Sequence, residues 1–261
     1  GFFEPQKTDQ NIQSPSFSKE FKDQLKKWES FPALRTTRAI SIFERIKPVM
    51  LEKIGSTARP QETLKAFGNF LSKLPAGIQI FSLFENNKQI LDLLIDILGT
   101  SGALSEYLVK NTDVLDSVIA SEFWKIWPSR KFLSSELEVM LESEMDYEAK
   151  LDLMRRWCKE WQFRIGVHYL RSQISAKRAG AQYAELAEIT LSIVWKEVIF
   201  EFAKKFGPEP GNGAAVISMG SLGSGVLHAN SDLDLIIIYD ADGNDQSEGD
   251  RSLSARQYYS R

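Results

Sequence analysis

The chain has 261 residues, of which 43% are apolar and 26% charged, and its net charge is −3. This is a globular composition, and the slightly acidic balance argues against a nucleic-acid partner, which usually needs a basic excess. No apolar run approaches the roughly 18 residues of a membrane helix, no signal peptide is visible, and the single cysteine favours a reducing, cytoplasmic location.

The N-terminal third predicts short helices. Residues 1–16 are polar and aperiodic, and we expect a loose arm there. Apolar residues then recur at helical spacing, which predicts helices over residues 17–33 (closed by Pro32), 34–54, 60–73 and 78–84.

Three more short helices are expected over residues 87–120. Gly99 is a plausible stop for the first of them, while Ser101 and Thr112 are suitable N-caps for the second and the third. Their similar lengths hint at a stacked array, although no sequence repeat supports it.

Longer helices follow in the next part of the chain. Ser134 or Ser135 is expected to open a helix that runs to about Glu144. The apolar pattern then predicts two long helices, over residues 147–170 and 177–206.

The composition changes at residue 207. A run of glycine and proline over residues 207–213 ends the last long helix. Residues 214–219 predict a short strand, and residues 233–239 predict a buried strand. We therefore expect a mainly α fold, with a multi-helix region over residues 1–206 followed by the start of an α/β domain over residues 207–261.

A glycine-rich turn precedes the second predicted strand. It comprises Met219 to Gly225, and its glycines would let the backbone approach a ligand closely and direct N–H groups at phosphate oxygens. The residues predicted to bind a nucleotide are Gly220, Ser221, Gly223 and Ser224 of this turn, together with Ser231.

Two carboxylates follow the turn. Asp232 and Asp234 are two residues apart, so on a strand both would point to one face, while Leu233 and Leu235 would point to a packed face. Neighbouring carboxylates repel each other unless a cation joins them. Mg²⁺ typically uses one or two carboxylates together with substrate phosphates, so we predict that Asp232 and Asp234 are metal ligands and catalytic residues. Most Asp-x-Asp pairs are merely solvated strand ends, and the preceding turn is what favours the functional interpretation.

Other polar residues receive structural interpretations. We expect His228 to be an exposed loop residue and His168 to be a packed or surface residue of a helix. With two histidines and one cysteine, a zinc site is improbable. The acidic turn over residues 240–245 lacks the later glutamate of a calcium loop.

The order and spacing of this motif resemble those of the polymerase-β-like nucleotidyltransferase superfamily, since ten residues separate Gly220-Ser221 from Asp232. A closer resemblance is to the glutamine synthetase adenylyltransferases. It rests on the turn and the Ser231–Leu235 segment, and it covers most of the chain. Further segments that resemble this family are Leu74–Gln79, Phe81–Phe84, Leu91–Leu94, Ile97–Gly99, Arg155-Arg156, Phe163–Ile165 and Ser252–Tyr259.

The resemblance implies an enzyme with two nucleotidyltransferase halves. One half transfers AMP from ATP to a tyrosine of glutamine synthetase, with Mg²⁺ as the metal, and the other half removes the AMP. This chain would be a fragment leading into the adenylylating half. The resemblance also implies regulation of nitrogen metabolism, with glutamine as an effector and the PII signalling protein as a partner.

The chain departs from this family at two positions, with Ser221 in place of its usual lysine and Val226 in place of a glutamate. The family also supplies a third aspartate from a later strand, and none is visible here, so we expect the fragment alone to be inactive. Two alternatives remain open: a different nucleotidyltransferase, and a non-catalytic helical module that binds glutamine synthetase or a PII-type regulator.

Overall fold

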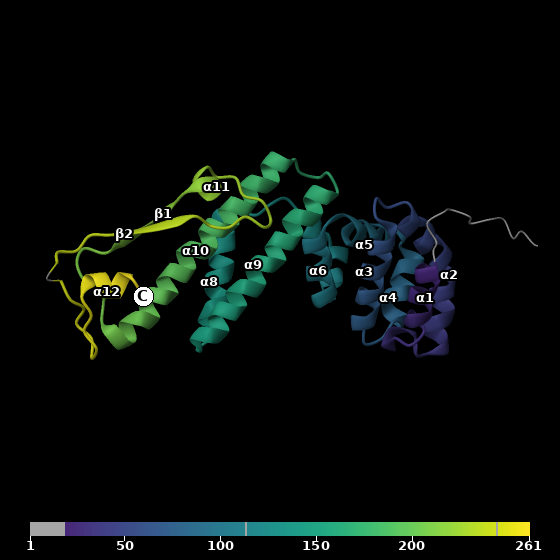
Figure 1. Ribbon diagram of the computed structural model, residues 1–261, viewed down its shortest axis with the longest axis horizontal. Coiled ribbons are helices and arrows are strands. Elements are labelled where there is room, and N and C mark those ends of the chain that lie inside the picture. Colours follow the sequence, from purple (N-terminus) through teal and green to yellow (C-terminus); the bar gives the residue numbers. More distant parts are fainter. Residues whose placement is uncertain (1–18, 113, 244) are drawn as a thin grey trace, which may run out of the picture. The chain divides into compact units, whose positions relative to one another are not determined.

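A computed structural model describes residues 19–112, 114–243 and 245–261 (Figure 1). The arm predicted over residues 1–16 lies outside these ranges. Helices dominate the described residues, which contain only two short strands, and this confirms the mainly α character of the fold. Contacts divide the chain into two compact units, with the division after Ile119. The domain boundary expected near residue 207 is a separate division and stays a prediction.

The first unit is built from short helices packed around an aromatic core. Trp28 contacts Phe43 and Phe67, and Phe43 contacts Phe81. The tight packing explains Gly68, since a Cβ there would lie 2.5 Å from the Trp28 Nε1. The helices are α1 (Lys19–Trp28), α2 (Thr37–Gly55), α3 (Pro60–Lys73), α4 (Ile78–Asn86), α5 (Lys88–Thr100), α6 (Gly102–Lys110) and α7 (Val114–Ile119), with a 3₁₀ turn, η1 (Pro32–Leu34).

The ends of these helices confirm some predictions and correct others. Ser101 caps α6, because its Oγ accepts a hydrogen bond from the Leu104 N–H at 3.3 Å. Pro32 opens η1 after α1 has already ended. Gly99 does not end α5; it lies in the last turn, where a Cβ would be 2.9 Å from Thr63 Oγ1 of α3. The cap predicted at Thr112 adjoins residue 113, which lies outside the described residues.

Three long helices form the body of the second unit: α8 (Arg130–Glu142), α9 (Tyr147–Leu170) and α10 (Ala176–Phe206). They follow a 3₁₀ turn, η2 (Ser121–Trp124). Their apolar faces meet in one core, whose buried side chains include Leu137, Trp157 and Leu186. The bounds of α9 agree with the prediction, and α10 starts one residue earlier than predicted.

Helix α8 begins before the predicted start at Ser134 or Ser135. Its N-cap is Ser129, whose Oγ accepts a hydrogen bond from the Phe132 N–H at 3.3 Å. The earlier start lets Leu133 join the buried stripe of the helix.

A two-stranded antiparallel sheet follows α10. Strand β1 (Ala214–Ser218) pairs with β2 (Leu235–Tyr239), and Ser218 lies opposite Leu235. Two short helices accompany it, α11 (Gly220–Gly223) and α12 (Ala255–Tyr259). The hydroxyl of Tyr258 in α12 donates to the Gly207 carbonyl at 3.1 Å, which ties this segment to the end of α10.

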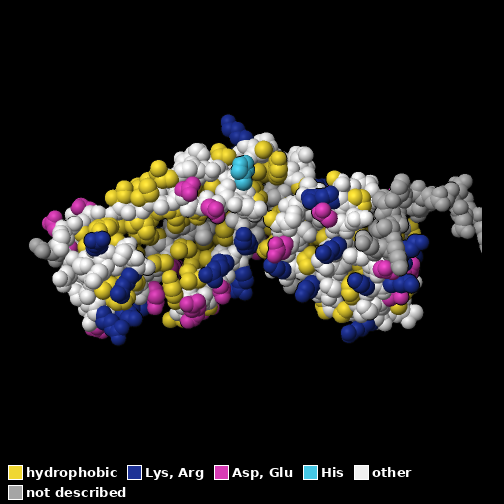
Figure 2. All heavy atoms as spheres, viewed as in Figure 1, with side chains coloured by type: hydrophobic (Ala, Val, Ile, Leu, Met, Phe, Trp, Pro, Cys, Tyr) yellow, Lys and Arg dark blue, Asp and Glu magenta, His cyan; other side chains and the backbone are white. Residues whose placement is uncertain are grey.

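The prediction of a buried second strand is wrong for this chain. Every residue of β2 is between 37% and 57% exposed, and apolar side chains gather over this hairpin on the surface (Figure 2). The strand also begins at Leu235, two residues later than predicted. A strand is buried only when other layers cover its faces. Among the described residues the Tyr259 ring of α12 stacks on Tyr239 at the end of β2, and this contact leaves the strand largely exposed.

Candidate functional site

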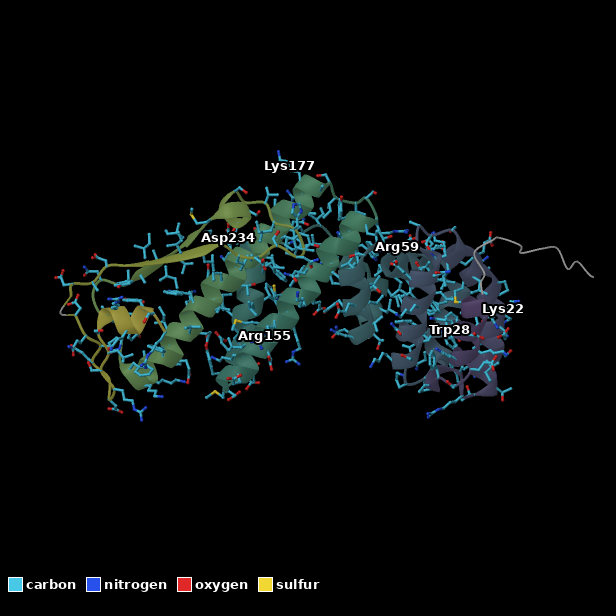
Figure 3. All side chains as sticks on the ribbon, viewed as in Figure 1. Lys22, Trp28, Arg59, Arg155, Lys177 and Asp234 are labelled. Atoms are coloured by element: carbon cyan, nitrogen blue, oxygen red, sulfur yellow. The ribbon has the colours of Figure 1, made fainter. Side chains whose placement is uncertain are left out.

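The hairpin brings the glycine turn and the aspartate pair to one end of the sheet. The Met219 N–H donates a hydrogen bond to the Asp234 carbonyl at 2.8 Å, directly after the last paired residues of β1 and β2. The turn of α11 therefore starts beside Asp234, which Figure 3 labels next to that helix. Residues predicted to act together are thus neighbours.

Gly220 is the point of closest approach. Its φ angle is +53°, and a Cβ built on it would overlap the Oδ2 atom of Asp234. Positive φ is unfavourable for residues with a Cβ, so both the backbone and the carboxylate require glycine here. The Asp234 carboxylate consequently lies against the first residue of α11.

The other turn residues use their polar groups locally. The Gly223 N–H donates to the Met219 carbonyl at 2.8 Å, and the Ser224 hydroxyl donates to the Ser221 carbonyl at 2.9 Å. A Cβ on Gly223 would lie 2.6 Å from the Ser218 carbonyl oxygen, so this glycine is needed for packing on β1. Any N–H groups offered to a ligand are those of the first helical residues, which have no intrahelical acceptor.

Ser231 closes the loop that leads to Asp232. Its Oγ accepts a hydrogen bond from the His228 N–H at 2.9 Å, and its own N–H donates to the His228 carbonyl at 3.1 Å. His228 is exposed, as expected. The role of Ser231 that the geometry supports directly is therefore to fix the backbone before Asp232.

The two aspartates lie in the segment just before β2, and both are exposed. The predicted face assignment assumed a strand at these positions. Leu233 and Leu235, expected on a packed face, are 42% and 37% exposed. What the structure gives is two accessible carboxylates at the end of the hairpin, one of them held against Gly220.

Two carboxylates are a suitable ligand set for a magnesium ion whose remaining ligands come from the substrate and from water. Carboxylate oxygens are hard ligands, and Mg²⁺ usually completes its shell with water and phosphate oxygens rather than with an all-protein cage. Among the described residues no group of three or more histidine, cysteine or acidic side chains could hold a metal ion. Asp232 and Asp234 would therefore need the nucleotide to complete the site.

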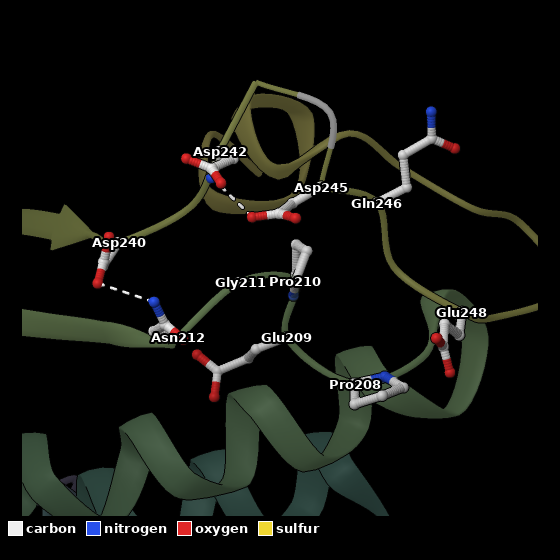
Figure 4. Close-up of a pocket in the computed structure, with 10 residues that line it drawn as sticks. All are labelled: Pro208, Glu209, Pro210, Gly211, Asn212, Asp240, Asp242, Asp245, Gln246 and Glu248. Carbon is white, nitrogen blue, oxygen red and sulfur yellow. Dashed lines mark hydrogen bonds between the residues drawn. The ribbon is translucent and has the colours of Figure 1, made fainter.

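An acidic pocket of about 550 Å³ lies at the opposite end of the hairpin (Figure 4). Two of its carboxylates are engaged in turn geometry: the Asp245 carboxylate accepts from the Asp242 N–H at 2.6 Å, and Asp240 accepts from the Asn212 side chain at 3.0 Å. The length of β2 separates Asp240 from Asp234 by about 20 Å. Asp240 is therefore too far away to be a third ligand beside Asp232 and Asp234.

The sequence interpretation missed the surface on which the turn rests. Leu222 of α11 and Leu227 of the following loop are buried against Ala184 of α10. The available signal was the placement of the small residues Gly180 and Ala184 four apart on α10, because such residues share one face of a helix. The turn is thus mounted on the helical body.

None of the helices in the part of the chain that the structure describes has the length and apolar composition that spanning a membrane requires.

Comparison with known proteins gives a consistent result. A family model described as glutamate-ammonia ligase adenylyltransferase matches residues 91–261. Among curated proteins, the bifunctional glutamine synthetase adenylyltransferase/adenylyl-removing enzyme of Mesorhizobium japonicum is 36% identical over 235 residues, which are 88% of this chain and 24% of that protein. The proteins of the same name from Brucella suis and Bartonella henselae are each 34% identical, over 91% and 87% of this chain. The chain spans about a quarter of the length of these relatives.

Proposed function

Because this chain belongs to the glutamate-ammonia ligase adenylyltransferase family, we propose that it is part of the adenylylating half of such an enzyme. That half transfers AMP from ATP to a tyrosine of glutamine synthetase. The observation that carries the proposal is the contact between the Asp234 carboxylate and Gly220, since it joins one of the two proposed metal ligands to the glycine turn. The names of the relatives support the reaction, and the likeness is to a quarter of each relative.

Asp232 and Asp234 are the proposed ligands of a divalent cation, Mg²⁺ or Mn²⁺. When bound, such a cation neutralises charge on the triphosphate and orients it for transfer. In this proposal the chain positions the two carboxylates at the end of the hairpin where Ser218 pairs with Leu235, and it keeps Asp234 beside the start of α11.

The turn residues have supporting roles in this proposal. In this proposal the first N–H groups of α11, at Gly220 and Ser221, donate hydrogen bonds to phosphate oxygens, because the first N–H groups of a helix have no intrahelical acceptor. Gly223 and Ser224 keep the turn compact, and Ser231 fixes the approach to Asp232. Ser221 offers a hydroxyl where the family usually has a lysine, so phosphate binding here would depend more on the metal.

Residues 207–261 are proposed to begin the catalytic, polymerase-β-like domain, and residues 1–206 to form a helical region before it. Transfer to a tyrosine needs a further carboxylate, which this family supplies from a later strand. We therefore propose that residues 1–261 do not catalyse the reaction by themselves.

The proposed partners are glutamine synthetase and ATP, with the PII signalling protein and glutamine as regulators. A cytoplasmic location agrees with the single cysteine, Cys158, whose thiol pKa is raised by burial and which is therefore suited to packing rather than to reaction.

The test is a titration of Mg²⁺ and a non-hydrolysable ATP analogue into the full-length protein, its Asp232→Asn variant and an Asp242→Asn control. We expect metal-dependent binding that Asp232→Asn weakens strongly and that Asp242→Asn leaves unchanged, because Asp242 lies in the distant acidic pocket. Equal binding by all three proteins would contradict the metal site. Absence of binding in the unaltered protein would favour the non-catalytic interaction module.

A further inference from the structure

The loop after α11 makes a direct backbone contact with α10. The Leu227 N–H donates a hydrogen bond to the Gly180 carbonyl at 3.1 Å. A carbonyl oxygen has two lone pairs, so this bond can coexist with the helical one. The loop that carries the proposed nucleotide residues is thus attached to a helix about 50 residues earlier in the chain.

This contact explains why residue 180 is glycine. A Cβ at Gly180 would lie 2.7 Å from Val226 Cγ1 and 3.3 Å from the Leu227 carbonyl oxygen. The distance to Val226 Cγ1 is shorter than any normal contact between two carbon atoms. The distance to the Leu227 carbonyl oxygen is at the lower limit of a van der Waals contact. Glycine inside a helix costs about 1 kcal/mol relative to alanine, and at this position it permits the loop to approach the helix.

Apolar contacts reinforce the attachment on both sides of the turn. Leu222 within α11 and Leu227 after it are 2% and 4% exposed, and both pack on Ala184, one helical turn after Gly180. Figure 1 shows α11 beside α10. Gly180 and Ala184 therefore contact the turn and the loop after it, and they lie on one face of α10.

The attachment fixes the segment that leads to the metal ligands. Only Ala229 and Asn230 separate His228 from Ser231, and the reciprocal hydrogen bonds between His228 and Ser231 close this short stretch. Any shift of Leu227 away from α10 would move the His228–Ser231 turn with it. Asp232 follows directly.

We propose that Gly180 is a positioning residue for the nucleotide and metal site, through which α10 sets the place of the loop from Met219 to Asp232. The inference rests on the proposed function, because it concerns the affinity of that site for metal and nucleotide. It makes the helical body a determinant of nucleotide affinity although Gly180 touches no ligand.

The experiment compares five forms of the full-length protein: unaltered, Gly180→Ala, Val226→Ala, the double variant, and Gly102→Ala. Gly102 is a matched control, because it is also a helical glycine but a Cβ there meets nothing within 4 Å. Three quantities are measured for each protein: the affinity for a Mg²⁺-bound ATP analogue, the hydrogen exchange of the Leu227 amide, and the thermal midpoint.

Gly180→Ala is expected to weaken nucleotide affinity on the order of tenfold, because small misplacements of binding groups are costly, and to speed exchange at Leu227. The thermal midpoint of Gly180→Ala should not fall along with its nucleotide affinity, since alanine stabilises a helix relative to glycine. Val226→Ala removes the atom that the new Cβ would meet, so the double variant should regain most of the lost affinity. Val226→Ala alone and Gly102→Ala should bind like the unaltered protein.

The outcomes separate this inference from the proposed function. If the unaltered protein binds nucleotide and Gly180→Ala binds equally well, the positioning role is wrong while the proposed function stands. If the double variant recovers nothing, the affinity loss has another origin and the inference fails. If the unaltered protein shows no metal-dependent binding, the proposed function fails, and the positioning role fails with it.

Discussion

Gly220 shows how one residue can satisfy two demands. Its backbone has a positive φ angle, and its missing side chain leaves room for the Asp234 carboxylate. Gly225 shares the positive φ angle, at +71°, but a Cβ there would meet nothing within 4 Å. Substitutions at Gly220 and Gly225 therefore distinguish the effect of backbone strain, which both would cause, from the effect of displacing the Asp234 carboxylate, which only Gly220 would cause.

Replacing Gly220 by alanine is expected to weaken metal-dependent nucleotide binding by at least about tenfold, because the new Cβ displaces Asp234. Gly225→Ala carries a similar backbone strain of about 1–3 kcal/mol and should lower the thermal midpoint with a much smaller effect on binding. Calorimetric titration and thermal unfolding of both variants check this. An equal loss of affinity in both would show that strain alone is responsible.

His168 is a packed residue of α9, which is one of the two placements expected from the sequence. Its ring stacks on Trp124 at 5.4 Å, and its Nε2 lies 2.7 Å from the Phe123 carbonyl oxygen. Burial lowers its pKa below the ordinary value; the hydrogen bond to Phe123 opposes this shift, and the charge of Arg164 adds to it. The neutral ring therefore holds η2 against α9.

A lowered pKa fixes the sign of a pH effect. Below about pH 6.5 the unfolded chain binds the proton more readily than the folded chain. The stabilising contribution of His168 is therefore complete above that pH and is lost as the pH falls through its lowered folded pKa. Unfolding of the unaltered protein and of His168→Gln, measured between pH 7.5 and 5, should show a steeper loss in the unaltered protein. Parallel curves would contradict the assignment.

At the scale of elements, α8 and α9 are joined by one carboxylate. Glu136 of α8 accepts hydrogen bonds from the indole N–H groups of Trp157 and Trp161, at 2.7 Å and 3.1 Å. Glu138, two residues on, makes an exposed ion pair with Lys196 at 3.3 Å. Substitutions at Glu136 and Glu138 therefore compare the loss of a hydrogen-bond acceptor for two indoles with the loss of an exposed ion pair.

Glu136→Ala should destabilise the chain by about 1–3 kcal/mol for each indole N–H that loses its partner, whereas Glu138→Ala should cost less than about 1 kcal/mol. Glu136→Gln keeps an acceptor and should fall between them. Denaturant unfolding of the three variants tests the ranking. If Glu136→Ala and Glu138→Ala lower the free energy of unfolding equally, water replaces the Glu136 carboxylate as acceptor for the two indole N–H groups.

The helices were largely predictable because their signals are local. The stretch Tyr147–Leu170 is flanked by caps and breaks, and its predicted bounds agree with α9. The start of α8 was missed because three nearby serines could each cap a helix, and only packing of Leu133 selects Ser129.

Burial of β2 could not be predicted, because an apolar run such as Leu235–Tyr239 does not reveal which layers cover it. For the site, the sequence pattern singled out the glycine turn and the aspartate pair, and the structure brings one of these aspartates, Asp234, against Gly220. The contact of Leu227 with Gly180 joins distant parts of the chain, and no local pattern contains it.

At the scale of the whole molecule, the described residues contain two accessible aspartates at the hairpin and no cluster of three acidic ligands. A tyrosine hydroxyl has a pKa near 10, and a positioned base typically contributes about 10²–10⁴-fold to the rate of such a transfer. On the proposed function, Asp232 and Asp234 supply the metal ligands, and the base for the tyrosine hydroxyl is a further group.

Residues 1–261 alone are expected to give no detectable transfer of labelled AMP to glutamine synthetase, while the full-length protein should be active. The assay compares the two proteins at equal concentration with Mg²⁺ and with Mn²⁺, and circular dichroism of the short chain serves as the folding control. Robust metal-dependent transfer by residues 1–261 would show that the catalytic set is already complete.

The contact between Gly180 and Leu227 also has a consequence in time. During synthesis at about 5–20 residues per second, Leu227 leaves the ribosome several seconds after Gly180. A helix such as α10 forms within about microseconds once its residues are free. The small-residue face of α10 is then ready before the glycine turn has been made, so the turn can settle on a finished surface. The positions of α10 and the glycine turn along the chain would thus set the order in which the two sides of this contact form.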